Sequence, residues 1–333
     1  MRSVNVLYVA MRHEYGDPRR GLSFEETNFR SSLEGMGHAV TPYDFMEEAA
    51  RNGVARMRED LVSLAAETQP ELAFFFLFTD QLDTATIEAV GSAGRCQTVN
   101  WFADDHWRFE DFSRHLAPAF DLAVTTDPDS LHKYASLANT RVHLSQWACN
   151  RYAYGKVTSE LKHDVTFVGQ PHGDRRQTVA TLQSAGLPVE CWGFGWPAGP
   201  IEHSQMVDTF ASSRINLNLS NSSQAPGLKA RIRRMLGFRP PPPRPPQIKG
   251  RNFEVPGCGG FLLTERVPHL EDYFELGREV GVFARSEDLV EQIRYWLEHD
   301  DERQAVADAG YRRVLAEHTY DHRFAAIFAA LGL

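Results

Sequence analysis

The apolar positions in the first half of the chain fall into short continuous runs separated by helical patterns. Helical spacing covers residues 23–35, through Phe24, Phe29 and Leu33, and residues 47–67 predict one long amphipathic helix. The apolar runs predict strands at 4–10, 38–43, 72–78, 97–102, 122–125 and 142–144. Alternation of this kind predicts βαβ units that build a parallel sheet with helices on both faces.

A second cycle of the same kind begins near residue 165. Strand patterns lie at 165–169, 189–193, 215–219, 261–264 and 280–284. Helical patterns lie at 175–185, 206–213, 288–299 and 302–317, and the segment 319–331 closes the chain. The sequence therefore predicts an α/β protein with two doubly wound domains, 1–150 and 160–315, followed by a C-terminal helical segment, 316–333.

One segment, 226–246, interrupts the second cycle. Its prolines disfavour a regular helix and favour an extended polyproline form. Its six cations are Lys229, Arg231, Arg233, Arg234, Arg239 and Arg244. Two interpretations stay open: a solvated insertion, or a basic flap that recruits a phosphorylated acceptor or a diphosphate.

The bulk composition excludes several classes of protein. The 333 residues carry a formal net charge of -9, which disfavours a general nucleic-acid or anionic-membrane binder. The four cysteines form no C-x-x-C pair, which predicts reduced thiols in a cytoplasmic protein and no zinc site. The apolar runs are too short for a signal peptide or a membrane span.

Residues 247–265 carry the strongest functional pattern. They predict a short helix with a carboxylate, Glu254, then a glycine turn at Gly259-Gly260, then a buried strand. Two cations, Lys249 and Arg251, stand just ahead of the carboxylate. Cations and backbone N–H groups suit a diphosphate, and a carboxylate suits ribose hydroxyls. The alternative is a plain helix–turn–strand whose glycines serve close packing, but the joint pattern favours the functional interpretation.

This stretch, K-x-R-x-F-E-x-x-x-C-G-G-F-L-L-T-E, resembles the donor-binding core of GT-B glycosyltransferases. Within group 1 of these enzymes it is most similar to the group of the spore maturation protein CgeB. The run from Ser286 to Tyr320 is similar to the tail of many GT-B transferases. The resemblance covers about residues 160–330.

The resemblance implies a fold, a reaction and a set of partners. The fold would have two Rossmann-like domains facing a central cleft, an acceptor in the N-terminal domain, a donor in the C-terminal one, and a last helix packing back toward the N-terminal domain. The reaction would move a sugar from a nucleotide-diphosphate sugar, by family frequency a UDP-sugar, without a cofactor or a bound metal. The acceptor would be a hydroxyl or amine of a small molecule, a protein or a glycan.

The resemblance also bears on the role of Glu254, which would bind the ribose. Many retaining members carry a second glutamate eight positions earlier, where this chain has Pro246. The stereochemical outcome therefore stays open.

Further donor contacts are predicted around the strand ends of the second domain. Gly169 follows a strand and precedes a helix, which is a natural anion nest, and Arg175 and Arg176 lie just beyond it. Gly193 and Trp196 flank the expected position of the nucleobase, although Trp196 can equally belong to the core. Backbone N–H groups of Gly259 and Gly260 complete the predicted diphosphate contacts.

In the first domain, two loops follow strands at the edge where ligands of parallel sheets bind. The first contains His13, Glu14 and, before the helix, Gly21; the second contains Asp104, Asp105 and His106. We predict a general base among Asp104, Asp105 and His13, and acceptor contacts from Glu14, Gly21 and His106. The alternative for the aspartates is a helix N-cap, and a metal site is the weaker interpretation.

Two other functions remain open. One is a sugar-nucleotide epimerase on the same scaffold, which needs no acceptor. The other is a non-catalytic protein that binds sugar nucleotides or polyanions. A dinucleotide dehydrogenase is disfavoured because no G-x-G-x-x-G follows the first strand.

Overall fold

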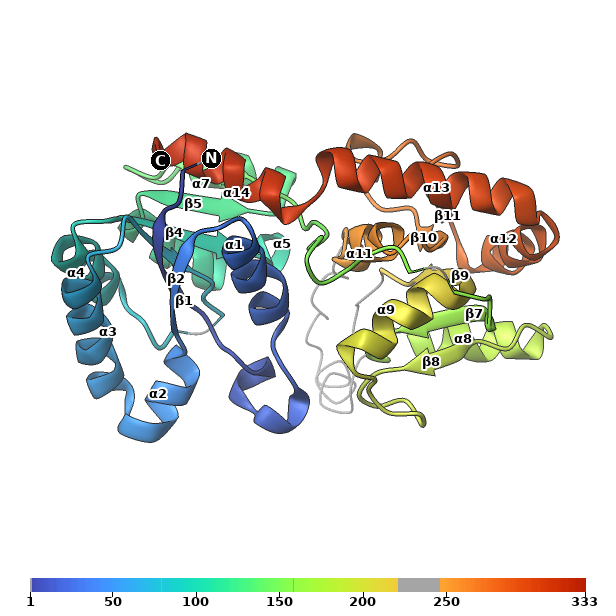
Figure 1. Ribbon diagram of the computed structural model, residues 1–333, viewed down its shortest axis with the longest axis horizontal. Helices are drawn as coiled ribbons and strands as arrows, with labels where there is room; N and C mark the ends of the chain where they lie inside the picture. Colours follow the sequence, from blue (N-terminus) through green and yellow to red (C-terminus); the bar gives the residue numbers. More distant parts are fainter. Residues whose placement is uncertain (1, 79, 158, 221–245) are drawn as a thin grey trace, which may run out of the picture. The chain divides into compact units, whose positions relative to one another are not determined.

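The computed structural model describes residues 2–78, 80–157, 159–220 and 246–333. The chain divides into two compact units, which we call unit 1 (Met1–Ala153 with Tyr320–Leu333) and unit 2 (Tyr154–Thr319) (Figure 1). The basic proline-rich segment predicted at 226–246 lies, except for Pro246, outside the described residues.

Unit 1 is built on a six-stranded sheet with the order β2-β1-β3-β4-β5-β6, in which every pairing is parallel. All residues of β3 and β5 are buried, which explains their unbroken apolar sequence. The strands are β1 (Asn5–Val9), β2 (Ala39–Tyr43), β3 (Leu72–Phe75), β4 (Gln97–Phe102), β5 (Leu122–Thr125) and β6 (Val142–Leu144).

Helices cover both faces of this sheet, and side chains alternate between two cores. Leu7 and Val9 pack with residues of α2 (Phe45–Asn52), α3 (Val54–Thr68) and α4 (Thr84–Gly94). Val6 and Tyr8 point to the other face, against Phe29 and the side chains of α14 (Tyr320–Leu331). The last helix of the chain is thus part of the core of unit 1, although its sequence follows unit 2 (Figure 1).

The helix predicted over residues 47–67 is two helices, and that prediction was wrong. The chain breaks at Gly53, whose φ of +83° is left-handed and interrupts the helical hydrogen-bond ladder. The remaining helices of unit 1 are short: α1 (Ser31–Gly35), α5 (Asp105–Arg108), α6 (Arg114–Leu116) and α7 (Leu131–Ala135), with π-helical segments at Glu26–Arg30 and Phe109–Ser113.

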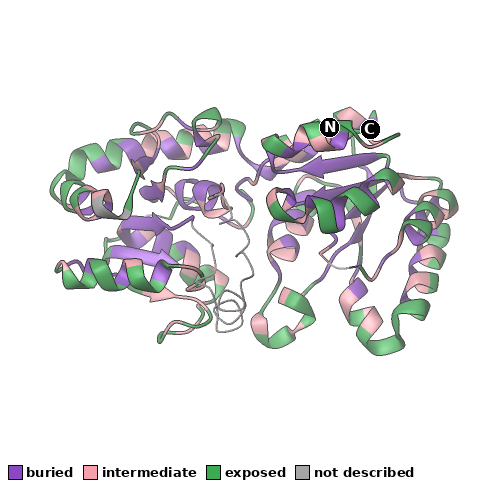
Figure 2. Cartoon of the chain, turned by 180° about the vertical axis from the view of Figure 1, so that it is seen from behind, coloured by how far each residue is buried: buried purple, intermediate pink, exposed green. Residues whose placement is uncertain are grey.

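Unit 2 has a parallel five-stranded sheet with the order β11-β10-β9-β7-β8. Its strands are β7 (His163–Val168), β8 (Glu190–Trp192), β9 (Ser213–Asn218), β10 (Leu262–Glu265) and β11 (Gly281–Phe283). Its helices are α8 (Arg175–Ser184), α9 (His203–Ser212), α11 (Arg251–Gly257), α12 (Ser286–Glu298) and α13 (Asp300–Glu317). Figure 2 shows the buried strands inside helices whose outer faces are exposed. Two parallel α/β units confirm the predicted fold class.

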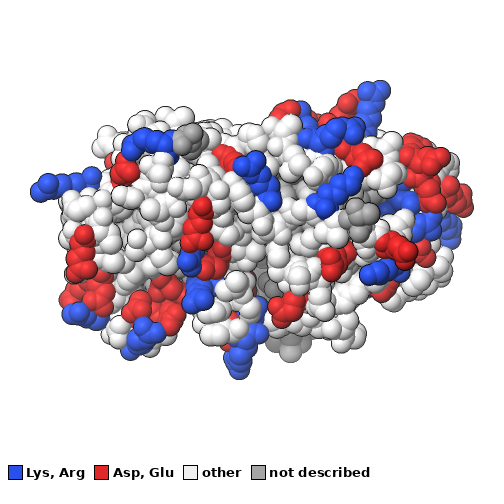
Figure 3. Space-filling model, viewed as in Figure 1, with Lys and Arg blue, Asp and Glu red and all other residues white. Residues whose placement is uncertain are grey.

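The structure can be compared with the predictions made from charge, hydrophobic runs and cysteines. Figure 3 shows acidic and basic side chains intermixed over the visible face. In the part of the chain that the structure describes, no helix is both long and apolar enough to cross a membrane. The four cysteines all lie among the described residues, and none forms a disulfide.

Candidate functional site

The carboxyl edge of the sheet in unit 2 is formed by the residues that follow β7, β8, β9 and β10, and ligands of open parallel sheets bind at such edges. At Gly169, which follows β7 with a φ of +154°, a Cβ would lie 2.8 Å from Nη1 of Arg251. At Gly193, which follows β8, a Cβ would lie 2.5 Å from the carbonyl oxygen of Gly169. A Cβ at Gly193 would therefore collide with the backbone. At Gly169 the positive φ disfavours a side chain, and the Arg251 guanidinium would have to shift.

Arg251 is the first residue of α11 and reaches this edge. Its guanidinium carbon lies 5.6 Å from the ring centroid of Phe167, and its Nε donates to Oδ1 of Asn218 over 3.4 Å. Burial lowers the pKa of Arg251, and the charge of Glu254 opposes that shift. The guanidinium is thus a cation held in a partly desolvated position, where its attraction for an anion is strong.

Glu254 stands one helical turn after Arg251, on the same face of α11. It is 5% exposed, and Tyr154 donates its hydroxyl proton to Oε1 over 3.2 Å. Burial raises the pKa of Glu254 to about 7, against the opposing effects of Arg251 and the Tyr154 hydroxyl. The pair forms a buried acid–cation site that offers one group to an anion and one to hydroxyls.

A buried amide network holds α11 against the strands. Asn218 in β9 donates from Nδ2 to Oδ1 of Asn252 (3.0 Å) and to Oγ1 of Thr264 (3.1 Å). The amide nitrogen of Asn252 also donates to Thr264 (3.1 Å), while its oxygen accepts from the backbone of Lys249 (2.8 Å). These contacts fix the backbone from which Lys249 and Arg251 project. Sequence reasoning missed the network as part of the site, although buried asparagines inside an apolar strand were its signal.

Arg175 lies at the same edge, but its guanidinium N–H groups donate hydrogen bonds to backbone carbonyl oxygens. It is buried, and it donates to the carbonyl oxygen of Leu219 from Nε (3.0 Å) and Nη2 (2.7 Å), and to that of Gln170 from Nη1 (2.7 Å). Burial lowers its pKa to about 9. The geometry therefore favours a positioning role for Arg175 over the predicted direct contact with a diphosphate.

Trp196 holds the loop after β8 in place. Its Nε1 donates to the carbonyl oxygen of Gly169 over 2.7 Å, and its ring meets Phe167 edge-on at 6.1 Å. Arg176 donates to the carbonyl oxygen of Gly195 and lies 5.2 Å above the Trp196 ring. The structure thus brings Gly169, Gly193, Trp196, Arg175, Arg176, Lys249, Arg251 and Glu254 to one edge of the sheet.

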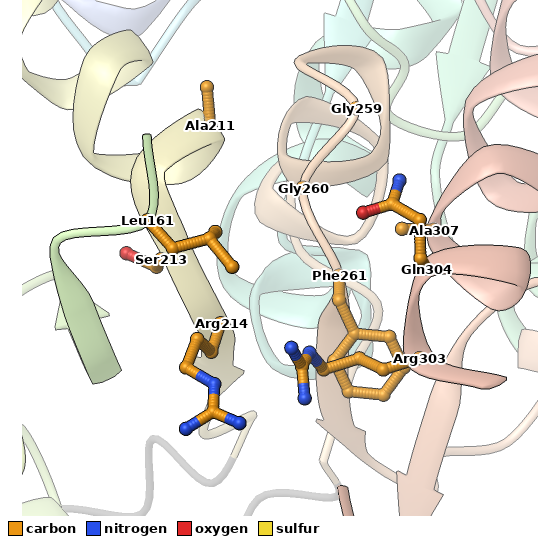
Figure 4. Close-up of a pocket in the computed structure, with 10 residues that line it drawn as sticks. All are labelled: Leu161, Ala211, Ser213, Arg214, Gly259, Gly260, Phe261, Arg303, Gln304 and Ala307. Carbon is orange, nitrogen blue, oxygen red and sulfur yellow. The ribbon is translucent and has the colours of Figure 1, made fainter. Parts of the chain in front are cut away.

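Gly259 and Gly260 lie at the opposite edge. Because α11 runs antiparallel to the strands, its end and the turn before β10 return to the amino edge. There the two glycines line a small pocket of about 30 Å³ with Ser213, Arg214 and others (Figure 4). A Cβ on Gly260 would collide with the carbonyl oxygen of Phe210. The predicted contact of these N–H groups with the diphosphate is therefore corrected: this geometry gives the two glycines a packing role.

In unit 1, the loop after β1 carries His13, Glu14 and Gly21. His13 pairs with Leu22 in an antiparallel bridge, and the backbone N–H of Glu14 donates to the carbonyl oxygen of Gly21 over 3.2 Å. Burial raises the pKa of Glu14. The three predicted residues are therefore neighbours on one closed loop at the carboxyl edge of the sheet.

The vicinal aspartates after β4 have different surroundings. Asp105 is buried, and its Oδ2 accepts from the hydroxyls of Thr125 (2.5 Å) and Tyr134 (2.8 Å). Burial raises the pKa of Asp105. Asp104 is partly exposed, beside His106, and lines a hollow of about 20 Å³ at the ends of β3 and β4. The geometry favours a structural role for Asp105 and leaves Asp104 as the carboxylate that solvent reaches.

Metal ligation needs several donor side chains to converge. Within the described ranges, no three His, Cys, Asp or Glu side chains gather in this way.

Comparisons with known protein sequences and structures indicate the class of this protein. Residues 175–329 match a family model described as glycosyl transferase-like. No curated protein sequence matches the chain significantly.

Solved structures match nearly the whole chain. A sucrose-phosphate synthase from Thermosynechococcus elongatus has 13% identity and a TM-score of 0.63, covering 98% of this chain and 99% of that one. Anabaena HepE in complex with UDP and glucose has 12% identity and a TM-score of 0.62, with the same coverage. A glycosyltransferase from Rickettsia africae has 7% identity and a TM-score of 0.63, covering 99% and 98%.

The fold and the family match together define the class. The protein is an enzyme, a glycosyltransferase of GT-B architecture, and it is similar to the group 1 transferases. The matched segment contains both Arg251 and Glu254.

Proposed function

We propose that the protein transfers a sugar from a nucleotide-diphosphate sugar, with a UDP-sugar as the favoured donor, to a hydroxyl or amine of an acceptor, without a metal ion. The observation that carries the proposal is the Arg251–Glu254 pair on one face of α11, at the carboxyl edge of the sheet in unit 2. HepE, which has a similar fold, was solved with UDP and with UDP-glucose, which supports UDP as the first nucleotide to test.

The donor contacts follow from the chemistry of the two side chains. The guanidinium of Arg251 presents a planar fork of donors that matches diphosphate oxygens, and the ammonium of Lys249 adds a second charge. Glu254 accepts hydrogen bonds from the ribose hydroxyls. As the glycosidic bond breaks, negative charge grows on the leaving diphosphate, and a fixed cation stabilises that charge more in the transition state than in the ground state.

The acceptor side of the reaction belongs to unit 1. Asp104 is the first candidate for the general base because it is the more accessible of the two vicinal carboxylates. His13 is the second candidate, and Glu14, Gly21 and His106 are the proposed acceptor contacts. An Asp104→Asn variant is expected to bind donor normally and to transfer slowly, whereas normal turnover would remove Asp104 as the base.

Three finer assignments belong to the same proposal. Transfer without a metal is expected because Arg251 supplies charge that a divalent ion supplies in other transferases; it predicts full activity in EDTA. The motif from Lys249 to Glu265 supports membership of the CgeB-like group. The absence of disulfides supports a reducing compartment such as the cytoplasm.

The test is a thermal-shift panel of UDP, GDP, TDP and CMP and their sugars, followed by transfer assays with the nucleotide that binds. Stabilisation follows RT ln(1 + [L]/Kd), so millimolar ligand at micromolar affinity gives a clear shift. One nucleotide that stabilises wild type but not Arg251→Ala is the expected result. No shift with any nucleotide contradicts the proposal, and conversion of the donor sugar without an acceptor favours an epimerase.

A further inference from the structure

Aromatic rings and guanidinium groups alternate over the carboxyl edge of the sheet in unit 1. Arg20 lies 4.8 Å above the ring of Tyr15, and that ring meets Phe78 edge-on at 5.6 Å. Arg108 lies 4.9 Å from the Phe78 ring and 5.6 Å from the ring of Trp107. This row, which we call the aromatic row, joins the loop after β1 to the residues that follow β3 and β4.

Two rings of the aromatic row face solvent. Tyr15 is 47% exposed in the loop after β1, and Trp107 is 40% exposed in the short helix α5. Tyr15 holds this position with a left-handed backbone, φ +55°. A non-glycine residue in that region is strained, and such strain gathers at ligand sites.

Nearby charged groups act on the Tyr15 hydroxyl. Burial first, and then the negative charges of Glu14, Asp104 and Glu25, raise the pKa of Tyr15, while Arg20 opposes them. Glu25 is buried, and its Oε2 has no hydrogen-bond partner among the described residues. Burial raises the pKa of Glu25 to about 8, so this side chain is largely neutral at pH 7. An unpartnered oxygen that deep in the protein is costly unless a ligand or water satisfies it.

The net charge of the aromatic row is close to zero. Glu14 and Asp104 balance Arg20 and Arg108, and Nη1 of Arg108 is already bonded to the carbonyl oxygen of Phe78 over 2.7 Å. The hollow of about 20 Å³ beside Asp104 holds one water or one hydroxyl group, and it is too small for a ring.

We propose that the aromatic row is the acceptor subsite and that it takes an uncharged carbohydrate. The apolar C–H face of the sugar packs on the exposed rings of Tyr15 and Trp107, its hydroxyls donate to Glu14 and Asp104, and one hydroxyl enters the hollow. This inference rests on the proposed function, and it makes Tyr15 and Trp107 the residues that determine acceptor specificity.

The experiment compares acceptors and variants after donor binding has been verified. The acceptors are glucose, galactose, N-acetylglucosamine and cellobiose, set against glucose 6-phosphate and glucuronate. The variants are Tyr15→Ala, Tyr15→Phe and Trp107→Ala. The matched control is Tyr295→Ala, because Tyr295 is 39% exposed but lies on α12, in the other unit. UDP-induced thermal shifts confirm that each variant is folded and binds donor.

We expect transfer to an uncharged sugar, with the acceptor KM raised about tenfold by Trp107→Ala and by Tyr15→Ala. Tyr15→Phe keeps the ring and is expected to stay near wild type, as is Tyr295→Ala. Preference for a charged sugar, an unchanged acceptor KM in both alanine variants, or use of none of the uncharged sugars by a protein that binds UDP would each overturn the subsite. A protein that binds no nucleotide overturns the proposed function instead.

Discussion

Removal of the Arg251 guanidinium is the sharpest test of the donor site. The side chain lies against Gly169, near the ring of Phe167, and beside the carboxyl group of Glu254. Arg251→Ala removes the hydrogen-bonding N–H groups of the guanidinium and leaves space that water fills. The amide network around Asn252 still holds α11. The variant is therefore expected to fold and to lose affinity for the diphosphate.

The size of the loss follows from the number of bonds. Each charge-assisted hydrogen bond contributes about 1.5 to 3 kcal/mol, and water replaces part of that in the variant. A net loss of about 2 to 4 kcal/mol weakens UDP binding about 30- to 1,000-fold. If wild type is saturated at 100 times its Kd, UDP stabilises it by about 2.7 kcal/mol, and a 100-fold weaker variant keeps only about 0.4 kcal/mol.

Titration calorimetry with UDP and thermal shifts at one fixed ligand concentration measure this loss. Arg251→Lys keeps the charge but not the fork, so we expect an intermediate affinity. Arg278→Ala is the control for charge, because Arg278 is exposed in the same unit and forms an ion pair with Glu275. Wild-type affinity in Arg251→Ala, or an equal loss in Arg278→Ala, would refute the reasoning.

Three further predictions concern pH and stability. Because the folded-state pKa of Glu254 (about 7) exceeds the ordinary value of 4.5, its contribution to stability is fully present below pH 4.5 and is lost as the pH rises through 7. Glu254→Gln should therefore be more stable than wild type at pH 8, by up to about 3 kcal/mol, with no gain at pH 4.5; a pH-independent difference in denaturant melts would contradict this. Gly193→Ala should lower the unfolding free energy by at least about 2 kcal/mol more than Gly199→Ala. The Cβ at 193 meets a backbone oxygen and its φ is +138°, whereas Gly199 has a φ of +72° and open space; equal losses would contradict this. Phe29→Ala should lower the free energy of unfolding in urea by about 3 to 5 kcal/mol, because Phe29 is fully buried among rings that include Tyr320 and Phe324. A loss below about 1 kcal/mol would contradict this and would mean that α14 packs loosely on the sheet.

The strands were the most predictable part of the fold. The predicted ranges 97–102, 122–125 and 142–144 coincide with β4, β5 and β6. In β5 the reason is plain, because a strand buried on both faces is a continuous apolar run. The helix predicted over 47–67 failed at Gly53, where the apolar spacing continues across a backbone break. The periodicity of apolar residues indicates which face of a helix is buried, but it does not indicate a left-handed φ between two helices.

The site was predictable where its residues share one element. Arg251 and Glu254 are three positions apart, so an α-helix places them on one face. Both residues belong to the motif from which the site was predicted. Gly259 and Gly260 are close to them in sequence but lie at the other edge of the sheet, because α11 carries the chain across the sheet before β10 returns. Tyr154, which bonds Glu254 from 100 positions away, gives no local signal.

The sequence by itself determined the two parallel α/β units, the strand ends of each sheet, and the cation and carboxylate of the proposed donor site, since these depend on local periodicity and short spacing. The tertiary structure alone decided which neighbours desolvate Glu254, which of the two aspartates is buried, where Arg175 directs its donors, and how Tyr15 and Trp107 join one row. Burial, pKa and side-chain partnership arise from contacts between segments distant in sequence, and no pattern within a single segment encodes them.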